Sequence, residues 1–378
     1  MKRVIVASID PLADSVYGAS ILEIFQSLSE LGYFVRIIVP SSRNQVKERG
    51  HLKVETLRVV RWIPLATLVY LYVQVLRSIL RERDLSAMLA DQAMLPLMGL
   101  VRILSKSRTI MLNSSRPVGY GGILGRIRFL QFKFSLILAR YFADAVTAIS
   151  PMEAEDFSRL GHIPKDKMVV VASPVTKIFT RHLPGTSDEL RRRLGLDRLC
   201  NKKVLLYYGS LVESRGIFQV LNVFSEAFEN SDRVVLLVVG EGSARKTIER
   251  LILTKRIRNC VSMGPVPYSK MPEVISACDL GLVILPDHPW WRYQCPTKLI
   301  ELLAMGKPVV ASNLPGVRWG AGGSSLVTYI NGLEPESFRA AVIEALRAPR
   351  RSEETWTYVE RFTSENLAIK IDSIITPR

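Results

Sequence analysis

The stretch PTKLIELLAMGKPVVAS, residues 296–312, predicts a short helix followed by a buried strand. Pro296 favours a helix start and Gly306 a helix end, so we expect a helix over residues 297–305 and a strand over residues 308–311. Lys298 lies in the first helical turn, where a cation is unfavourable unless an anion lies there too. Glu301, one turn further on, can accept hydrogen bonds from hydroxyl groups; a surface ion pair with Lys298 is the simpler alternative. The stretch therefore predicts an α/β unit with an anion near one helix start.

The same alternation of apolar runs and helical segments extends over both halves of the chain. Expected strands cover residues 4–8, 34–39, 85–90, 109–112, 145–149 and 168–172 in the first half, and residues 204–208, 234–239 and 280–284 in the second. Strands that alternate with helices indicate parallel sheets covered on both faces. We therefore expect an α/β fold of two Rossmann-like, doubly wound domains, residues 1–179 and 180–352, facing a central cleft. The helical residues 353–378 carry enough apolar side chains to pack back on the first domain.

Two glycine-bearing strand ends are candidates for phosphate binding. In YGSLVESRG, residues 208–216, the expected strand leads into Gly209, and Arg215 precedes a helix start. Glycines let a phosphate approach the backbone, and a helix N-terminus and a cation favour it. In VGEG, residues 239–242, a buried strand ends in a tight turn. Each of these patterns alone is more often an ordinary turn.

Taken together, these segments resemble glycosyltransferase family 4, the glycosyl transferases group 1, whose members are retaining enzymes with the GT-B fold. The matching pieces are residues 208–216, 239–242, 264–266, 277–280 and 296–316, in the family's order and spacing. The resemblance covers residues 204–317 well and extends weakly into the first half, through residues 145–150. It implies the GT-B fold and sugar transfer from a nucleotide diphosphate sugar, with UDP and GDP as candidate nucleotides.

The resemblance also implies roles for individual residues. Arg215 would bind the donor diphosphate, the backbone amides of Thr297 and Lys298 would meet the phosphates, and Glu301 would hold the ribose. The segment that contains Val266 would lie near the base. The expected donor-binding set is Gly209, Ser210, Arg215, Gly240, Gly242, Val266, Thr297, Lys298 and Glu301.

The sequence departs from the family pattern around the transferred sugar. The family often has two glutamates seven residues apart; Glu301 matches the second, but Tyr293 occupies the first position. Ser210 stands where a basic residue is frequent, and the first half has no histidine between His51 and His162. Arg215 and Lys298 are therefore the main catalytic candidates. Weaker candidates are Asp91 at an expected strand end, and Asp287 and His288.

The charge distribution predicts a negatively charged partner. The formal net charge is +16, from 51 basic and 35 acidic residues. Residues 92–143 contain no Asp or Glu, and they are rich in Leu, Ile and Phe beside basic residues that include Arg116, Arg126, Arg128 and Lys133. Basic residues interleaved with aliphatic ones suit an anionic membrane surface better than nucleic acid, and they favour a lipid-linked or glycan acceptor. The simpler alternative is a solvated basic face.

The apolar residues 62–76 are too few to span a bilayer comfortably. We expect an interfacial helix or a core helix there. The N-terminus predicts a strand and no signal peptide. The four cysteines form no C-x-x-C pair and are expected to be reduced thiols. We expect a cytoplasmic protein, peripheral on the cytoplasmic face of the membrane.

No cofactor or metal is expected, because the chain has no paired D-x-D carboxylates and four scattered histidines. The leading hypothesis is a retaining glycosyltransferase of the hexosyltransferase type. The alternatives are a sugar-nucleotide epimerase, a pseudoenzyme that lost activity with the missing glutamate, and a basic nucleic-acid-binding protein. The sequence does not identify the sugar, the nucleotide or the acceptor.

Overall fold

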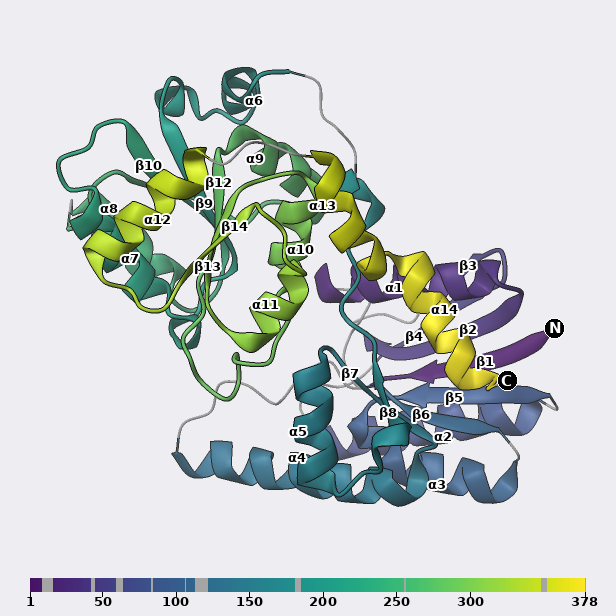
Figure 1. The fold of residues 1–378 in the computed structure, drawn as a ribbon. Coiled ribbons are helices and arrows are strands. Elements are labelled where there is room, and N and C mark those ends of the chain that lie inside the picture. The colour runs from purple at the N-terminus through teal and green to yellow at the C-terminus, as the bar shows by residue number, and fades with distance from the viewer. Residues whose placement is uncertain are drawn as a thin grey trace. The chain divides into compact units, whose positions relative to one another are not determined.

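The structure is a computed structural model that describes residues 1–8, 16–41, 45–58, 64–82, 84–105, 107–112, 122–180, 185–254, 256–347 and 352–377. The chain forms two compact units (Figure 1). Unit 1 comprises residues 1–174 and 362–378, and unit 2 comprises residues 175–361. The divisions thus fall after Pro174 and Arg361, whereas the sequence suggested residues 179 and 352.

Unit 1 is built on an eight-stranded sheet in the order β3-β4-β2-β1-β5-β6-β7-β8. The strands are β1 (Lys2–Ala7), β2 (Tyr33–Ser41), β3 (Gln45–Arg49), β4 (Leu52–Arg58), β5 (Leu85–Ala90), β6 (Arg108–Met111), β7 (Ala145–Ala148) and β8 (Met168–Val170). All pairs are parallel except β3 with β4. The sequence did not predict this hairpin, because β3 is exposed along its whole length and is mostly polar.

Helices cover both faces of the unit 1 sheet, since alternate strand residues point to opposite sides. Ile5 and Ala7 pack with α2 (Pro64–Arg81), α3 (Leu95–Leu104), α4 (Gly122–Phe142) and α5 (Pro151–Gly161). Val4 and Val6 pack in a second cluster with α1 (Val16–Glu30) and α14 (Ser364–Ile375). In α2, Leu71, Val75 and Ile79 are core residues, so one face of the apolar segment predicted at residues 62–76 belongs to the core.

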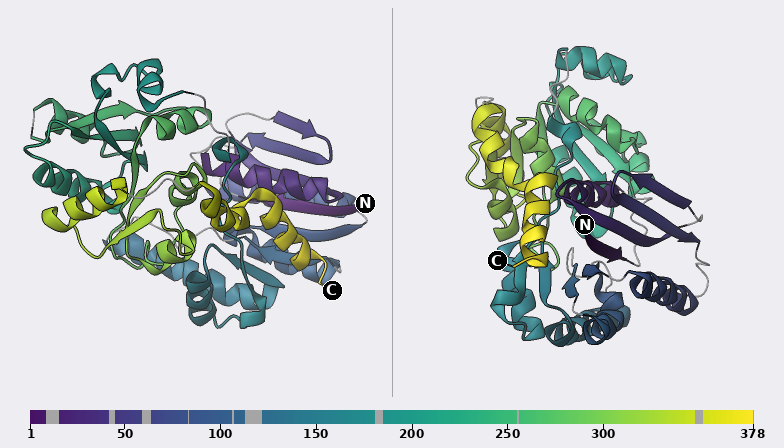
Figure 2. Two further views of the ribbon diagram at one scale, coloured as in Figure 1. Left: turned by 45° about the horizontal axis from the view of Figure 1, so that its top comes forward. Right: turned by 90° about the vertical axis from the view of Figure 1, so that its right-hand side faces the viewer.

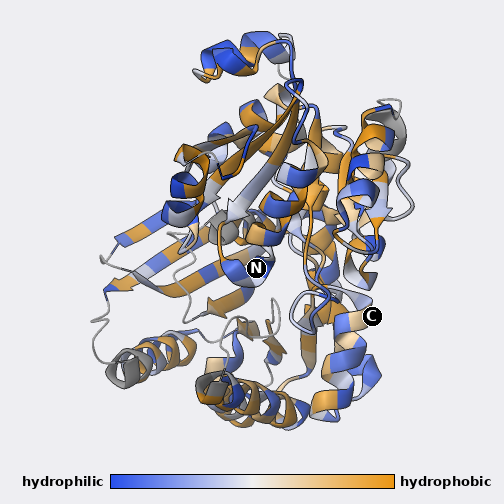
Figure 3. Cartoon of the chain, turned by 90° about the vertical axis from the view of Figure 1, so that its left-hand side faces the viewer, coloured by the Kyte–Doolittle hydropathy of each residue, from blue (hydrophilic) through white to orange (hydrophobic). Residues whose placement is uncertain are grey.

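Unit 2 is built on a six-stranded parallel sheet in the order β11-β10-β9-β12-β13-β14. The strands are β9 (Lys203–Ser210), β10 (Val234–Glu241), β11 (Cys260–Gly264), β12 (Leu280–Val283), β13 (Val309–Ser312) and β14 (Val327–Ile330). The helices are α6 (Ser187–Arg193), α7 (Ile217–Ala227), α8 (Arg245–Leu253), α9 (Met271–Ala277), α10 (Thr297–Ala304), α11 (Pro315–Ala321), α12 (Pro335–Arg347) and α13 (Ser352–Val359). Coloured by hydropathy, its strands are mainly hydrophobic (Figure 3). The strand order reverses between β9 and β12, and ligands of such sheets bind beside the carboxyl ends of the strands at this switch point.

The C-terminal residues form two helices where the sequence suggested one helical segment. Helix α13 contacts α10 within unit 2, whereas α14 lies against α1 in unit 1 (Figure 2). Thr363 caps the start of α14 by accepting a hydrogen bond from the backbone N–H of Asn366. The Tyr33 hydroxyl donates a hydrogen bond of 2.5 Å to Asp372 of α14. The chain therefore returns to unit 1 with its last helix.

Candidate functional site

Close backbone packing shapes the carboxyl ends of β9 and β10. Gly240 has a φ of +148°, and a Cβ atom there would lie 1.9 Å from the carbonyl oxygen of Gly209. A Cβ atom at Gly242, with a φ of +156°, would lie 2.2 Å from the carbonyl oxygen of Leu211. Only glycine suits both positions. Gly209 itself has a φ of +112° with open space where its Cβ would be, and Ser210 beside it is exposed.

Arg215 is held in the loop that follows β9. It ends the short 3₁₀ helix Glu213–Arg215, and Gly216, with a φ of +75°, connects that helix to α7. The Arg215 guanidinium lies over the Trp291 ring, 4.9 Å from its centroid. The Trp291 indole N–H donates a 2.8 Å hydrogen bond to the backbone carbonyl of Ser214, which ties the residue 291 loop to the Arg215 loop. Burial lowers the pKa of Arg215.

Lys298 lies in the first turn of α10 and is 6% exposed. Its Nζ atom lies 4.4 Å from the centroid of the Tyr207 ring, a cation–π contact. The pKa of Lys298 is lowered to about 7, first by burial and then by the nearby charge of Arg215, whereas Glu301 acts in the opposite direction. Arg215 also interacts electrostatically with Tyr207, whose buried hydroxyl has no hydrogen-bond partner among the described residues.

Arg215 and Lys298 thus bring two positive charges together at the switch point. Within the described ranges, no carboxylate lies within ion-pair distance of either cation. Buried or partly buried charges are normally paired, because leaving water costs each of them several kcal/mol. The arrangement is therefore incomplete without an anion. The first N–H groups of α10, those of Thr297 and Lys298, have no acceptor within the helix and add to this preference.

Glu301 is buried at 3% exposure and accepts two tyrosine hydrogen bonds. The Tyr208 hydroxyl donates to one carboxylate oxygen over 2.6 Å, and the Tyr268 hydroxyl donates to the other over 2.7 Å. Burial raises the pKa of Glu301, although both hydrogen bonds and Lys298 act in the opposite direction. Tyr268 lies in the 3₁₀ helix Tyr268–Lys270, just after β11, and its ring meets that of Phe179 edge-on. Glu301 is therefore fixed in place and does not form the surface ion pair that the sequence left open.

The structure places the other predicted donor-site residues on the same sheet edge. Val266 is half-buried in the segment after β11, and Thr297 is the half-buried first residue of α10. Pro296 precedes α10 in an extended conformation. Gly316, at the start of α11, approaches the loop before α10 so closely that a Cβ atom would lie 2.3 Å from the carbonyl oxygen of Gln294.

The weaker catalytic candidates are engaged in local contacts. Asp287 is exposed and forms an ion pair with Arg292, with 3.1 Å between Oδ1 and Nε. His288 is exposed, and its ring lies 4.3 Å from that of Trp290. In unit 1, Asp91 caps the 3₁₀ helix Gln92–Met94 by accepting from the N–H of Ala93 over 3.0 Å.

Asp91 also lies at the switch point of the unit 1 sheet. Its second carboxylate oxygen accepts a 2.9 Å hydrogen bond from Ser8, at the end of β1. Strand β1 is the neighbour of β5, and the strand order reverses between them. These contacts give Asp91 a structural role.

Helix α4 presents an apolar and basic surface on unit 1. Phe132, Leu136 and Ala139 are buried in the core, so this face of α4 is not available to a membrane. The opposite face carries the exposed residues Ile123, Ile127, Leu130 and Phe134 at helical spacing. Arg126, Arg128 and Lys133 are exposed beside them. The predicted residue Arg116 lies outside the described residues.

The described residues contain neither a membrane-spanning helix nor a metal-binding cluster of side chains. None of the described helices combines the length and apolar character that a membrane-spanning segment needs. In the same part of the chain, no three His, Cys, Asp or Glu side chains lie close enough together to hold a metal ion.

Sequence reasoning missed four aromatic residues of the site: Tyr207, Tyr208, Tyr268 and Trp291. A weak signal was present for two of them, since Tyr207 and Tyr208 directly precede Gly209 at the end of a buried strand. Tyr268 lies 33 residues before Glu301, so nothing in their spacing indicates a contact.

Comparisons with known proteins match both units. A family model described as glycosyl transferases group 1 matches residues 202–348, and one described as a glycosyl transferase 4-like domain matches residues 17–174. Among curated relatives, alpha-D-kanosaminyltransferase of Streptomyces kanamyceticus is 25% identical over 46% of this chain and 44% of its own length. D-inositol 3-phosphate glycosyltransferase of Segniliparus rotundus is 28% identical over 55% of this chain and 46% of its own. The chain thus spans about half of the length of these relatives, or less.

Solved structures agree on the fold. Anabaena HepE, in a complex with UDP and glucose, has a TM-score of 0.75 at 15% identity, over 99% of both chains. The two family models together cover most of the chain, one in each unit. The chain therefore belongs to the glycosyl transferases group 1, with the GT-B fold and a resemblance to glycosyltransferase family 4.

Proposed function

We propose that the protein transfers a sugar from a nucleotide diphosphate sugar to an acceptor hydroxyl, and that unit 2 binds the donor. One observation carries this proposal: Arg215 and Lys298 lie together, and among the described residues no carboxylate lies at ion-pair distance from either. A diphosphate supplies the missing negative charge and can accept hydrogen bonds from the start of α10.

The proposed roles follow the positions of the side chains. Arg215 and Lys298 bind the diphosphate and stabilise the negative charge that develops on it as the sugar leaves. Glu301 holds the ribose, because a carboxylate that already accepts two phenols keeps lone pairs for ribose hydroxyls. The segment around Val266 lies near the base. Asp91, Asp287 and His288 receive no catalytic role, since each is engaged in local structure.

The donor class and the stereochemistry extend the proposal. Retention at the anomeric carbon is what the resemblance to glycosyltransferase family 4 implies. UDP-sugars are the first donors to test, because HepE was solved with UDP and glucose; GDP-sugars come next. The proposed reaction uses the protein's own cations and helix ends, with no metal and no cofactor.

For the acceptor, we propose a lipid-linked molecule at an anionic membrane surface, with unit 1 as the acceptor domain. The exposed apolar residues of α4 and the basic residues beside them support this. A helix of this kind lies in the interface with its apolar face in the lipid, and each nearby basic residue contributes about 1 kcal/mol. The four cysteines are free thiols, which fits the cytoplasmic leaflet.

The test is a panel of UDP-, GDP- and ADP-sugars, incubated with the protein and anionic vesicles that contain polyisoprenyl phosphate. We expect one donor to raise the melting temperature and to yield a glycosylated lipid together with free nucleoside diphosphate. An epimerase would instead return an altered sugar nucleotide, and a pseudoenzyme would bind the donor without turnover. Absence of any nucleotide-sugar binding would contradict the proposal itself.

A further inference from the structure

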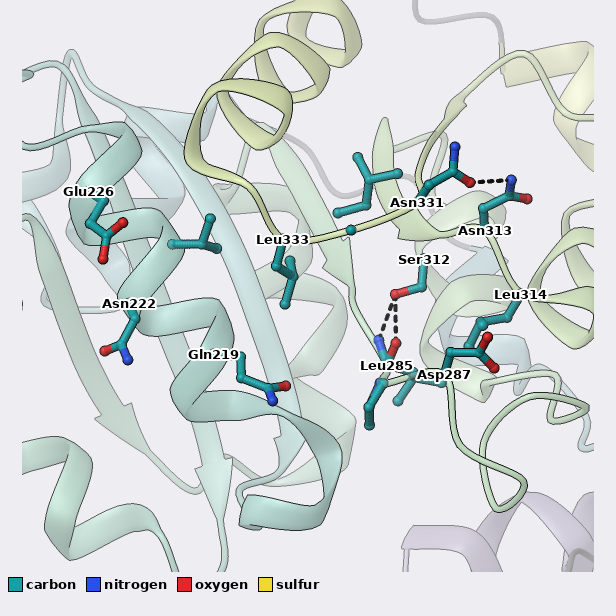
Figure 4. Close-up of a pocket in the computed structure, with 14 residues that line it drawn as sticks. Gln219, Asn222, Glu226, Leu285, Asp287, Ser312, Asn313, Leu314, Asn331 and Leu333 are labelled. Carbon is teal, nitrogen blue, oxygen red and sulfur yellow. Dashed lines mark hydrogen bonds between the residues drawn. The ribbon is translucent and has the colours of Figure 1, made fainter.

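A pocket of unit 2 lies at the carboxyl ends of β12, β13 and β14. It has a volume of about 570 Å³, within the range of roughly 300–1,000 Å³ that small-molecule sites occupy. Figure 4 shows its two walls. One wall is α7, and the other consists of the residues that follow β12, β13 and β14.

The α7 wall offers polar side chains with free hydrogen-bonding capacity. Gln219, Asn222 and Glu226 follow one another at spacings of three and four residues and so share one face of the helix. All three are exposed, and among the described residues none of their side chains has a hydrogen-bond partner. The amides of Gln219 and Asn222 can therefore both donate to and accept from a ligand, and the Glu226 carboxylate can accept.

The strand-end wall combines amides with an apolar surface. Asn313 donates a 2.7 Å hydrogen bond to Asn331, which joins the ends of β13 and β14. The Ser312 hydroxyl both donates to and accepts from the backbone of Leu285, so it fixes β13 to the end of β12. Leu314 and Ile330 contribute aliphatic surface between these polar groups.

The charge of the pocket is opposite to that of the whole chain. No Lys, Arg or His is among the residues that line it, although the formal net charge of the protein is +16. It contains the carboxylates of Glu226 and Asp287, the second of which is paired with Arg292. A phosphate or nucleotide would meet the exposed carboxylate of Glu226, while Arg292 and Arg318 are already engaged with Asp287 and Asn313, so the pocket suits such ligands poorly.

We propose that this pocket binds a neutral saccharide. Sugar hydroxyls donate and accept hydrogen bonds, as amides do, and the C–H faces of sugar rings pack on aliphatic side chains. The pocket begins near the cationic site: α7 starts beside Arg215, and Pro286, which lines the pocket, lies 3.5 Å from where a Cβ atom of Gly216 would be. The binding of a saccharide here does not depend on the proposed function. Only the identification of that saccharide as part of the acceptor or product rests on the proposed function.

The experiment is a titration of the full chain, with labelled Ile, Leu and Val methyl groups, followed by NMR. The probes are maltotriose, cellotriose, mannotriose and, as an anionic counterpart, trigalacturonate. We expect at least one neutral trisaccharide to give saturable shifts in the methyl signals of Leu285, Leu314 and Ile330. Trigalacturonate should bind more weakly, because the Glu226 carboxylate repels it.

Two variants of exposed residues locate the binding. Asn222→Leu combined with Asn331→Leu should weaken the neutral trisaccharide by at least about tenfold, since both amides are lost from the pocket. The matched control Asn230→Leu lies beyond the end of α7 and outside the pocket, and it should bind as the wild type does. Arg215→Gln should also leave saccharide binding unchanged. Saccharide binding to this pocket can therefore be confirmed even if Arg215 proves not to bind the donor. Methyl shifts absent for all neutral probes, or equal affinity in the double variant and the wild type, would overturn the proposal.

Discussion

The hydroxyl of Tyr208 donates a 2.6 Å hydrogen bond to the carboxylate of Glu301, with both side chains buried. The contact joins the end of β9 to the middle of α10 across the switch point of the sheet. Desolvation and the neighbouring carboxylate raise the pKa of Tyr208 well above its ordinary value, so the phenol stays protonated and remains a donor.

This pair should be energetically coupled. Tyr208→Phe leaves a buried carboxylate short of one hydrogen bond, which should lower the free energy of unfolding by about 1–3 kcal/mol. Glu301→Gln removes the charge that needs this bond, so the double variant should lose less than the sum of the single variants. Urea unfolding of the four proteins measures the coupling. Strictly additive losses would show that the phenol does not support the carboxylate.

Donor binding should weaken as the pH rises through about 7, the pKa of Lys298. Below that pKa Lys298 is charged and attracts the diphosphate; above it the free protein holds a neutral amine and must take up a proton to bind. Bound diphosphate favours the charged form and raises the pKa, so binding near pH 8 should be accompanied by proton uptake. Calorimetry in buffers of different ionisation enthalpy measures this uptake. Lys298→Met should abolish it, and equal uptake in this variant would assign the proton to another group.

Membrane binding should depend on the exposed face of α4. Ile127→Asp combined with Leu130→Asp should release the protein from anionic vesicles in co-sedimentation, and so should charge reversal of Arg126, Arg128 and Lys133. Higher salt should act in the same direction as the charge reversal. Leu253→Asp is the matched control, because Leu253 is 82% exposed on α8 of unit 2. Wild-type protein that stays in the supernatant with anionic vesicles would refute membrane docking.

Turnover should persist in EDTA. The proposed site neutralises the diphosphate with the protein's own cations, Arg215 and Lys298. The measurement compares initial rates before and after chelation. Activity that vanishes in EDTA and returns with magnesium or manganese would require a metal in the mechanism.

The sequence predicted those parts of the fold that follow from local patterns. Buried strands such as β9 and β10 are apolar runs that end at glycines, so their place and type could be read directly. The β3–β4 hairpin escaped prediction, because an exposed edge strand need not be apolar. The end of the chain was wrongly predicted as one helical segment. Its apolar residues belong to two helices, of which α13 packs against α10 and α14 against α1.

The site residues that lie within sequence motifs could be predicted. The residues that reach the site only through tertiary packing could not. Arg215, Lys298 and Glu301 lie in segments whose spacing resembles the family pattern. Their partners Trp291 and Tyr268 come from loops that meet them only in the folded structure. Likewise, no local pattern indicates that Arg292 pairs with Asp287.

The role of Arg215 in donor binding is tested by calorimetry, which compares the affinities of the wild type and of Arg215→Gln for a nucleoside diphosphate. The ligand is whichever of UDP, GDP and ADP binds the wild type most tightly. Arg292→Gln is the matched control, because Arg292 is exposed and paired with Asp287. Losing the charge-assisted contact of Arg215 should cost about 1.5–3 kcal/mol of binding free energy, more than about tenfold in the dissociation constant, while the control keeps wild-type affinity. Unchanged affinity in Arg215→Gln would contradict the assignment of these cations to the donor diphosphate.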